Sequence, residues 1–268
     1  MSGVAAMSGA ERIAAAFESA RAEGRRAALM PYLMAGYPDL ERSREIARDY
    51  VAGGADLIEL GIPFSDPLAD GPVIHAADVA ALAAGANVTD ALSVVRAVDE
   101  HVPVVVMCYA NVILARGLER FADLLAEVGA SGLIVPDLPL EEAPAIRELL
   151  DARGLALVPL VAPTTPDERL TRIGAAARGF VYTVSVTGTT GERDESDAGL
   201  PEILARVRAH SEVPVALGFG IGTPAQAAAA AAAGADGVIV GTRLVRAAGE
   251  APGEVRSLVA EFAAALAA

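Results

Sequence analysis

Eight short apolar runs recur along the chain, and stretches with helical spacing separate them. The runs are residues 29–34, 56–62, 102–109, 132–136, 155–161, 180–184, 213–218 and 237–240. Each run is continuously apolar rather than alternating, which is expected when both faces of a parallel sheet are buried. Strand and helix units repeated in this way are typical of a (β/α)8 barrel. We therefore expect an α/β fold, a TIM barrel that spans residues 1–268 as a single domain.

Short sequences repeated at the helix–strand junctions support this interpretation. Gly-Ala-Asp at 54–56 and 234–236 and Gly-Ala-Ser at 129–131 each end a helix and open a strand. Val-Pro-Val opens two further strands at 102–104 and 213–215. An open, doubly wound sheet is the alternative, but no glycine-rich dinucleotide turn follows the first run, so the barrel is favoured.

An extra helix is expected ahead of the barrel. Residues 8–25 alternate Ala with Glu and Arg at helical spacing, and Ile13 and Phe17 fall on one face. The other helical stretches are residues 39–52, 73–84, 89–100, 118–128, 141–153, 166–177, 201–210, 223–233 and 252–268.

Composition and charge exclude several classes of function. A net charge of −14 leaves no basic surface for nucleic acid, and the apolar runs are interrupted before they reach the length of a membrane span. The single cysteine, Cys108, rules out a disulfide framework and suits a reducing compartment. No basic segment followed by an apolar one opens the chain. We expect a cytoplasmic protein without a nucleic-acid or membrane partner.

The absence of lysine restricts the chemistry further. All 21 basic residues are Arg, so Schiff-base catalysis and covalently bound pyridoxal phosphate are excluded in this chain. The three histidines are scattered, and no group of His, Asp and Cys has the spacing of metal ligands. We therefore expect no cofactor and no metal here, and chemistry that depends on carboxylates or hydroxyls.

A stiff acidic loop follows the second apolar run. Residues 59–72 contain three prolines and three carboxylates, and Glu59 stands where the strand ends. Barrel active sites lie at that end of the strands. Burial there would raise the pKa of Glu59 and fit it for acid–base catalysis, while Asp70 could stay ionised and accept a substrate N–H. The alternative is structural: Glu59 bonds a neighbouring backbone, and Asp66 and Asp70 form turns before proline.

Two glycine-rich turns follow the last two strands. Residues 217–223 read Leu-Gly-Phe-Gly-Ile-Gly-Thr, and residues 240–243 read Val-Gly-Thr-Arg. Barrels often bind phosphate at this position through backbone N–H groups and the N-terminus of a short helix, which residues 244–248 could supply. Tight packing of helix on sheet also requires glycine, so a structural role stays open.

A long polar loop and several polar strand ends complete the set of candidates. Residues 187–199 are too long and polar for a simple connection, so they form either a lid or a solvated insertion. Polar side chains at or near other strand ends are Tyr109, Asn111, Asp137 and Tyr182.

Together these residues resemble the α subunit of tryptophan synthase. The similarity rests on the loop after Glu59, Leu-Gly-Ile-Pro-Phe-Ser-Asp-Pro-Leu-Ala-Asp-Gly-Pro at 60–72, and on Met-Cys-Tyr-Ala-Asn at 107–111. Three further motifs agree: Val-Pro-Asp-Leu-Pro at 135–139, Gly-Thr-Thr-Gly at 188–191 and Gly-Phe-Gly-Ile at 218–221. The resemblance implies a lyase that cleaves indole-3-glycerol phosphate to indole and glyceraldehyde 3-phosphate by a retro-aldol reaction.

The resemblance also implies roles for individual residues. Glu59 would shuttle the proton, and Asp70 would accept the indole N–H. The residues implied to surround the indole are Tyr32, Met107, Tyr182, Phe219 and Ile239, with Thr190 on the lid. The residues implied to bind phosphate through backbone N–H groups are Gly191, Gly220, Gly241 and Thr242.

The family works as an αββα heterotetramer in which the β subunit carries pyridoxal phosphate and receives indole through a tunnel. By resemblance, Pro63, Asp66 and Pro139 would face that subunit. The departures from the family pattern are Thr189 in the lid, His75 in place of Gln, Thr242 in place of Ser, and Tyr32 where Phe is common. The competing readings are a free-standing lyase, another phosphate-binding barrel isomerase, and an inactive subunit that only activates a partner.

Overall fold

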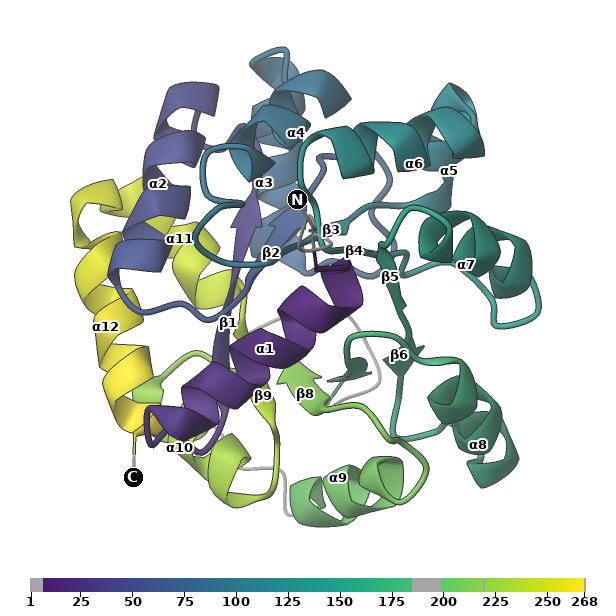
Figure 1. The fold of residues 1–268 in the computed structure, drawn as a ribbon. Helices are drawn as coiled ribbons and strands as arrows, with labels where there is room; N and C mark the ends of the chain where they lie inside the picture. The colour runs from purple at the N-terminus through teal and green to yellow at the C-terminus, as the bar shows by residue number, and fades with distance from the viewer. Residues whose placement is uncertain (1–6, 185–198, 219, 268) are drawn as a thin grey trace, which may run out of the picture.

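The computed structural model describes residues 7–184, 199–218 and 220–267, and it is an α/β barrel (Figure 1). Its strands are β1 (Ala28–Met34), β2 (Ile58–Gly61), β3 (Val104–Met107), β4 (Gly132–Ile134), β5 (Ala156–Val158), β6 (Leu160–Val161), β7 (Val181–Val184), β8 (Val215–Gly218) and β9 (Gly237–Val240). Its helices are α1 (Gly9–Ala22), α2 (Leu40–Ala52), α3 (Pro72–Ala83), α4 (Val88–Val95), α5 (Ala110–Arg116), α6 (Leu118–Glu127), α7 (Ala143–Asp151), α8 (Asp167–Ala176), α9 (Leu200–Arg208), α10 (Pro224–Ala232), α11 (Thr242–Glu250) and α12 (Val255–Leu266), with a 3-10 turn at Pro252–Glu254.

The strands are all parallel and follow the order β5-β4-β3-β2-β1-β9-β8-β7-β6. Only Pro159 separates β5 from β6, and proline has no N–H to give to a ladder. Its carbonyl accepts the N–H of Tyr182 at 2.9 Å. The first half of this apolar run pairs with β4 and the second half with β7, so the ring closes through one broken strand. The predicted TIM barrel is confirmed, with the fifth predicted strand divided in two.

Side chains alternate between the barrel interior and the helical layer. On β2, Ile58 and Leu60 pack in the outer cluster against the helices, while Glu59 between them faces inward. The side chains of the inner cluster come from α1, from the strands and from residues directly before strands: Ile13, Phe17, Ala20, Ala28, Met30, Leu57, Val105, Ile134, Ala156, Val158, Phe180, Tyr182, Ala216 and Ile239. Glu59 is thus an acid at a core-facing position.

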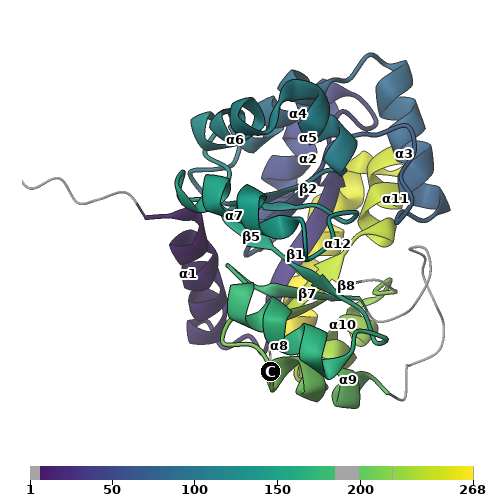
Figure 2. The same ribbon diagram turned by 90° about the vertical axis from the view of Figure 1, so that its right-hand side faces the viewer.

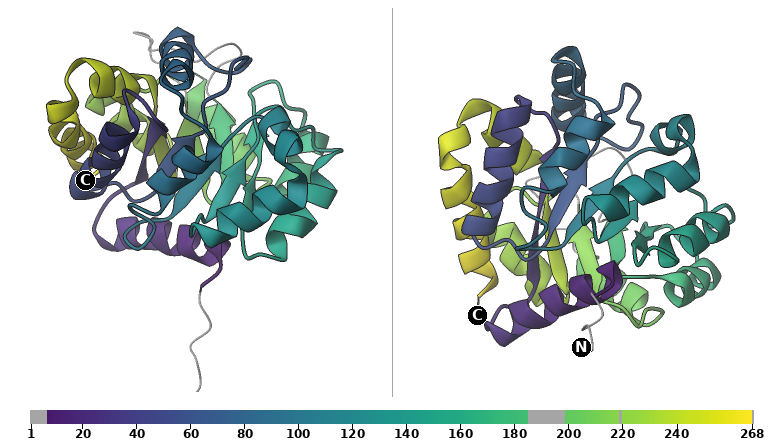
Figure 3. Two further views of the ribbon diagram at one scale, coloured as in Figure 1. Left: turned by 90° about the horizontal axis from the view of Figure 1, so that it is seen from above. Right: turned by 45° about the horizontal axis from the view of Figure 1, so that its top comes forward.

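The expected N-terminal helix is present as α1, and it closes one end of the barrel. Ser8 and Glu11 form a capping box at its start, and Ile13 and Phe17 belong to the inner cluster. Figures 2 and 3 show α1 and α3 at opposite ends of the strands. The loop between β2 and α3 therefore lies at the open end.

Some element boundaries differ from the sequence prediction. The helix expected at 89–100 ends at Val95 and continues as turns, and the strand expected at 102–109 is paired only over Val104–Met107. The seven-residue helix α5 was not predicted. It ends at Gly117 and buries one side chain, Ile113, so it is too short to show the apolar periodicity from which a helix is predicted. Within the described part of the chain no single helix has the length and apolarity of a membrane span; α3 and α4 reach that composition only as a pair bent by 112°.

Candidate active site

Glu59 lies among the inward-facing residues of neighbouring strands. In the parallel register it is the partner of Tyr32 on β1 and of Val105 on β3. The residue is only 2% exposed, and its Oε2 atom is buried without a hydrogen-bond partner in the described residues. A buried polar atom left without a partner is costly, so this carboxyl at a strand end is a candidate for a functional role.

Burial shifts the protonation of Glu59. Loss of solvation raises the pKa of Glu59 to about 8, and the charge of Asp70 adds to the effect. At neutral pH this carboxyl is therefore mostly protonated. A general acid needs this state at the start of a reaction.

Asp70 sits in the loop after β2 and has different partners. Its Oδ2 accepts the hydroxyl of Tyr109 at 2.9 Å, and its N–H is bonded to the carbonyl of Pro67 at 3.3 Å. Burial raises the pKa of Asp70 to about 6, against the opposing effects of the Tyr109 hydrogen bond and of His75. Asp70 is thus mostly ionised at neutral pH. The two carboxyls therefore rest in different protonation states, an arrangement that in known enzymes separates an acid role from an anion role.

Two buried tyrosines flank the carboxyls. Burial raises the pKa of Tyr32 and of Tyr182, and the charges of Glu59 and Asp70 raise both further, so both hydroxyls lie within the field of the two acids. A side chain on Gly61 would collide with the Tyr32 hydroxyl, so glycine is required for this ring to lie across the end of β2. Met107 and Ile239 pack in the same inner layer as Tyr182. These four side chains form an apolar wall, to which the two tyrosines add hydroxyl groups.

The second glycine-rich turn lies beside this wall. Gly241 precedes α11 and Thr242 is the first residue of that helix. A Cβ placed on Gly241 would lie 3.8 Å from the Cβ of Tyr32. Gly220 follows β8 with φ of +85°, which favours glycine. The first hydrogen bond of α11 runs from the N–H of Leu244 to the carbonyl of Gly241 at 2.9 Å, so the N–H groups of Thr242 and Arg243 precede it, and such a helix start attracts an anion.

A sequence model of the family described as "Tryptophan synthase alpha chain" matches residues 17–267. The chain belongs to this family. It is 49% identical over 247 residues to the tryptophan synthase alpha chain of Prochlorococcus marinus (strain MIT 9313), covering 91% of this chain and 89% of the relative. The tryptophan synthase alpha chain of Methanopyrus kandleri is 44% identical over 230 residues, with coverages of 86% and 83%.

A solved structure agrees with this assignment. A chain of Mycobacterium tuberculosis tryptophan synthase superposes with a TM-score of 0.90 at 43% identity, covering 96% of this chain and 98% of that one. The resemblance drawn from the motifs is confirmed. The chain is a tryptophan synthase alpha family lyase of tryptophan biosynthesis, built on a TIM barrel.

The structure brings together most of the predicted site residues. Glu59, Tyr32, Met107, Tyr182 and Ile239 all lie on the inner side of the strands or their ends. Gly220, Gly241 and Thr242 lie at the ends of β8 and β9. Thr189, Thr190, Gly191 and Phe219 lie outside the described residues.

Three residues near the site had no predicted role. Tyr109 stood out only as a polar strand end, whereas Phe64 and Asp78 were not singled out. Asp78 occupies the same face of α3 as Ile74, Ala77 and Ala81, all buried. An acid at a core position of an otherwise apolar helix face was the available signal.

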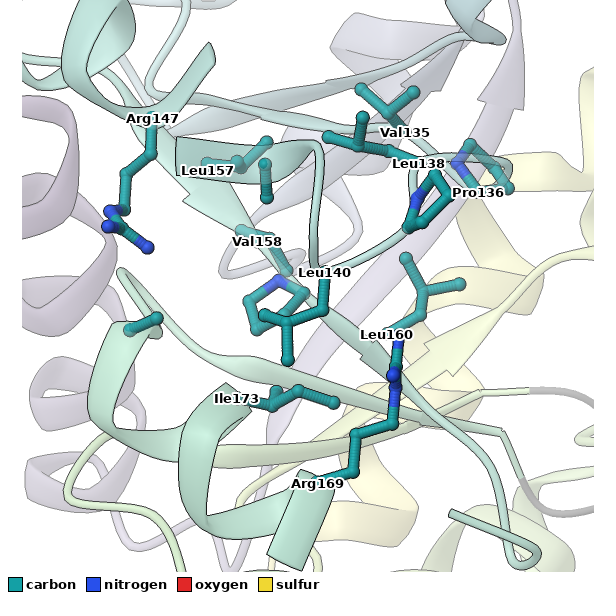
Figure 4. A pocket seen from close by; sticks show the side chains of 14 residues that line it. Val135, Pro136, Leu138, Leu140, Arg147, Leu157, Val158, Leu160, Arg169 and Ile173 are labelled. Carbon is teal, nitrogen blue, oxygen red and sulfur yellow. The ribbon is translucent and has the colours of Figure 1, made fainter. Parts of the chain in front are cut away.

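The residues implied to face a partner occupy two loops at the open end. Asp66 and Pro139 are exposed, whereas Pro63 is buried. An apolar pocket of about 150 Å³ opens beside Pro139, with Leu140, Val158 and Ile173 around it and Arg147 at its edge (Figure 4). Across residues 7–184, 199–218 and 220–267, no three His, Cys, Asp or Glu side chains group as a metal site requires.

Proposed function

We propose that this chain cleaves indole-3-glycerol phosphate to indole and glyceraldehyde 3-phosphate, with Glu59 as the proton shuttle. The observation that carries the proposal is the contrast between two carboxyls. Glu59 is buried and its pKa is raised to about 8, whereas Asp70, whose pKa is about 6, is mostly ionised. Retro-aldol cleavage of this substrate requires first an acid and then a base, and one carboxyl can serve as both.

The reaction begins with the protonated form of Glu59. It gives its proton to the indole ring carbon that carries the glycerol chain, and a positive charge develops on the ring nitrogen. Asp70 accepts the indole N–H and stabilises that charge. The Glu59 carboxylate then takes the proton of the adjacent side-chain hydroxyl. The carbon–carbon bond breaks, its electrons return to the ring, and the aldehyde forms, so Glu59 ends protonated again.

The remaining contacts orient the substrate. Tyr32, Met107, Tyr182 and Ile239, with Phe219, would surround the indole. The phosphate would bind N–H groups of Gly220, Gly241 and Thr242 and of Gly191 in the lid, where Thr190 also lies. Because the chain has no lysine, amide dipoles at the start of α11 would provide most of the attraction.

We further propose that the chain works with a β subunit in an αββα complex, and that pyridoxal phosphate is bound only by that partner. Pro63, Asp66 and Pro139 would face it. Support comes from Leu68, which lies in the same loop as Asp66 and is 84% exposed, and from the apolar pocket beside Pro139. Exposed apolar side chains of this kind favour a protein interface. A cytoplasmic location is part of this proposal, because the sole cysteine is a free buried thiol.

An indole-release assay on wild type and Glu59→Gln tests the reaction. We expect the variant to lose at least about 100-fold in rate, the usual contribution of a general acid–base group. Glu119→Gln, an exposed glutamate on α6, is the matched control and should keep the wild-type rate. Full activity in a folded Glu59→Gln variant would show that the mechanism is wrong.

The same assay with and without a β subunit tests the partnership. We expect slow indole release by the chain alone, faster release with the partner, and co-purification of the two. Wild-type turnover that the β subunit leaves unchanged, without co-purification, would instead identify a free-standing lyase.

A further inference from the structure

Asp78 is a buried acid that the proposed reaction does not use. It is 1% exposed and lies on the buried face of α3 beside Ala77. Its Oδ1 accepts the N–H of Phe64 at 3.0 Å, while Oδ2 is buried and finds no partner among the residues described. A carboxyl is seldom buried so completely unless it is paired or hydrogen-bonded, so the contact with Phe64 is the one to explain.

The contact with Phe64 is the first of three contacts that form a path from Asp78 to Asp70. The Phe64 ring stacks on Tyr109, with 5.2 Å between the ring centroids and 25° between the planes. Two contacts therefore hold Phe64 in place. Its N–H donates to Asp78 on α3, and its ring packs on Tyr109, the residue that precedes α5. A displacement of the Phe64 backbone would remove one face of the support for the Tyr109 ring.

The Tyr109 hydroxyl carries the path to Asp70. It accepts the N–H of Ala69 at 3.1 Å and donates to Oδ2 of Asp70 at 2.9 Å. One hydroxyl thus fixes two consecutive residues of a loop that has no regular secondary structure. The direction of the Asp70 carboxylate depends on where the Tyr109 ring lies.

We propose that Asp78 is a positioning residue for Asp70, which it acts on through the amide of Phe64, the Phe64–Tyr109 stack and the Tyr109 hydroxyl. The inference deepens the proposed function, since it rests on Asp70 as the acceptor of the indole N–H. Small errors in the placement of such an acceptor reduce rates strongly, because its field must point at the charge that develops.

The electrostatics of Asp78 agree with this role. Burial raises the pKa of Asp78 to about 7; the N–H of Phe64 opposes the shift, and the charge of Asp70 adds to it. Burial, with a smaller contribution from the charge of Asp70, therefore leaves Asp78 partly protonated at neutral pH. The anchor keeps its acceptor oxygen for Phe64 without placing a full second negative charge beside Asp70.

Amide hydrogen exchange on the full-length chain tests the path without any substrate. Asp78→Ala, which removes the anchor, should speed exchange at the distant Ala69 amide at least about fivefold. Asp78→Asn, which keeps an acceptor oxygen, should restore protection. Tyr109→Phe removes the Ala69 acceptor directly, so adding Asp78→Ala to it should produce little further change at Ala69. If Asp78→Ala does not fold, Phe64→Leu breaks the stack alone and should also expose the Ala69 amide.

Turnover provides the second measurement, made with the same variants in the presence of a β subunit. We expect kcat to fall about tenfold in Asp78→Ala and to recover most of the wild-type value in Asp78→Asn, with Glu119→Ala as the unaffected control. An Ala69 amide that stays protected in Asp78→Ala, or rate losses that multiply in the Asp78→Ala/Tyr109→Phe double variant, would overturn the inference. Absence of indole release by the wild type would refute the proposed function instead, and the exchange result would still decide whether the path exists.

Discussion

The hydroxyl of Tyr109 donates a hydrogen bond to Oδ2 of Asp70 over 2.9 Å, joining the end of β3 to the loop that follows β2. This bond favours the charged form of Asp70, whereas burial favours the neutral form. The balance leaves an ionised carboxylate beside the protonated Glu59. A residue thirty-nine positions away in sequence thus helps set the charge of the proposed site.

Tyr109→Phe should raise the pKa of Asp70, since it removes the hydrogen bond that lowers this pKa. The acid limb of the pH–rate profile for indole release should move to higher pH. A hydrogen bond to a charged group contributes roughly 1.5–3 kcal/mol, so kcat/KM at neutral pH should fall about tenfold or more. Steady-state kinetics across pH 5–9 would measure both effects.

Tyr50→Phe is the matched control for that variant. Tyr50 is also buried, but its hydroxyl donates to the backbone carbonyl of Tyr32 at 3.0 Å. Its loss should reduce thermal stability without moving the acid limb. An acid limb that shifts equally in both variants would contradict the assigned role of Tyr109.

The wild-type rate should follow a bell-shaped dependence on pH. Activity should rise through about pH 6 as Asp70 loses its proton and fall through about pH 8 as Glu59 loses its own. The two groups interact, so the apparent values belong to the pair. A profile of kcat/KM from pH 5 to 10 would measure them, and activity that keeps increasing above pH 9 would be incompatible with Glu59 as the initial acid.

Glu59→Gln should change how stability depends on pH. The pKa of Glu59 is raised from 4.5 in the unfolded chain to about 8 in the folded one, so the free energy of unfolding falls progressively between these two pH values and levels off above them. Glutamine has no such charge. Denaturant unfolding should find the variant more stable than wild type at pH 9, by on the order of a few kcal/mol.

The same comparison at pH 4 provides the control. This pH lies below the unfolded pKa of 4.5, so Glu59 is mostly neutral in the folded and the unfolded chain, and the stability difference between the two proteins should shrink towards zero. A stability difference that is the same at pH 4 and pH 9 would show that Glu59 is not perturbed as described.

Gly220→Ala should raise the KM for indole-3-glycerol phosphate, because the amide at a φ of +85° is one of the groups proposed to bind phosphate. Gly85→Ala is a matched control: its φ is +87°, and an added Cβ meets nothing within 4 Å. Both variants carry similar backbone strain, but only Gly220→Ala should weaken substrate binding, about fivefold or more. Equal KM values would remove Gly220 from the phosphate site.

The sequence alone was sufficient for the barrel, because continuous apolar runs bounded by glycine and proline are compatible with few other arrangements than a parallel sheet buried on both faces. It also singled out Glu59 as a candidate, because an acid ends that apolar run, and the structure places this residue buried on β2. Local patterns of this kind can be recognised in the sequence, because each depends only on residues that are neighbours along the chain.

Only the tertiary structure could decide contacts between distant segments. The register that pairs Glu59 with Tyr32 and the bond from Tyr109 to Asp70 each join different strand–helix units, and the bond from Phe64 to Asp78 joins a loop to the helix that follows it. The division of a strand at Pro159 likewise shows only in its pairing with two different neighbours. Burial and charge at these contacts set the pKa values, and both are properties of the packed fold rather than of any stretch of sequence.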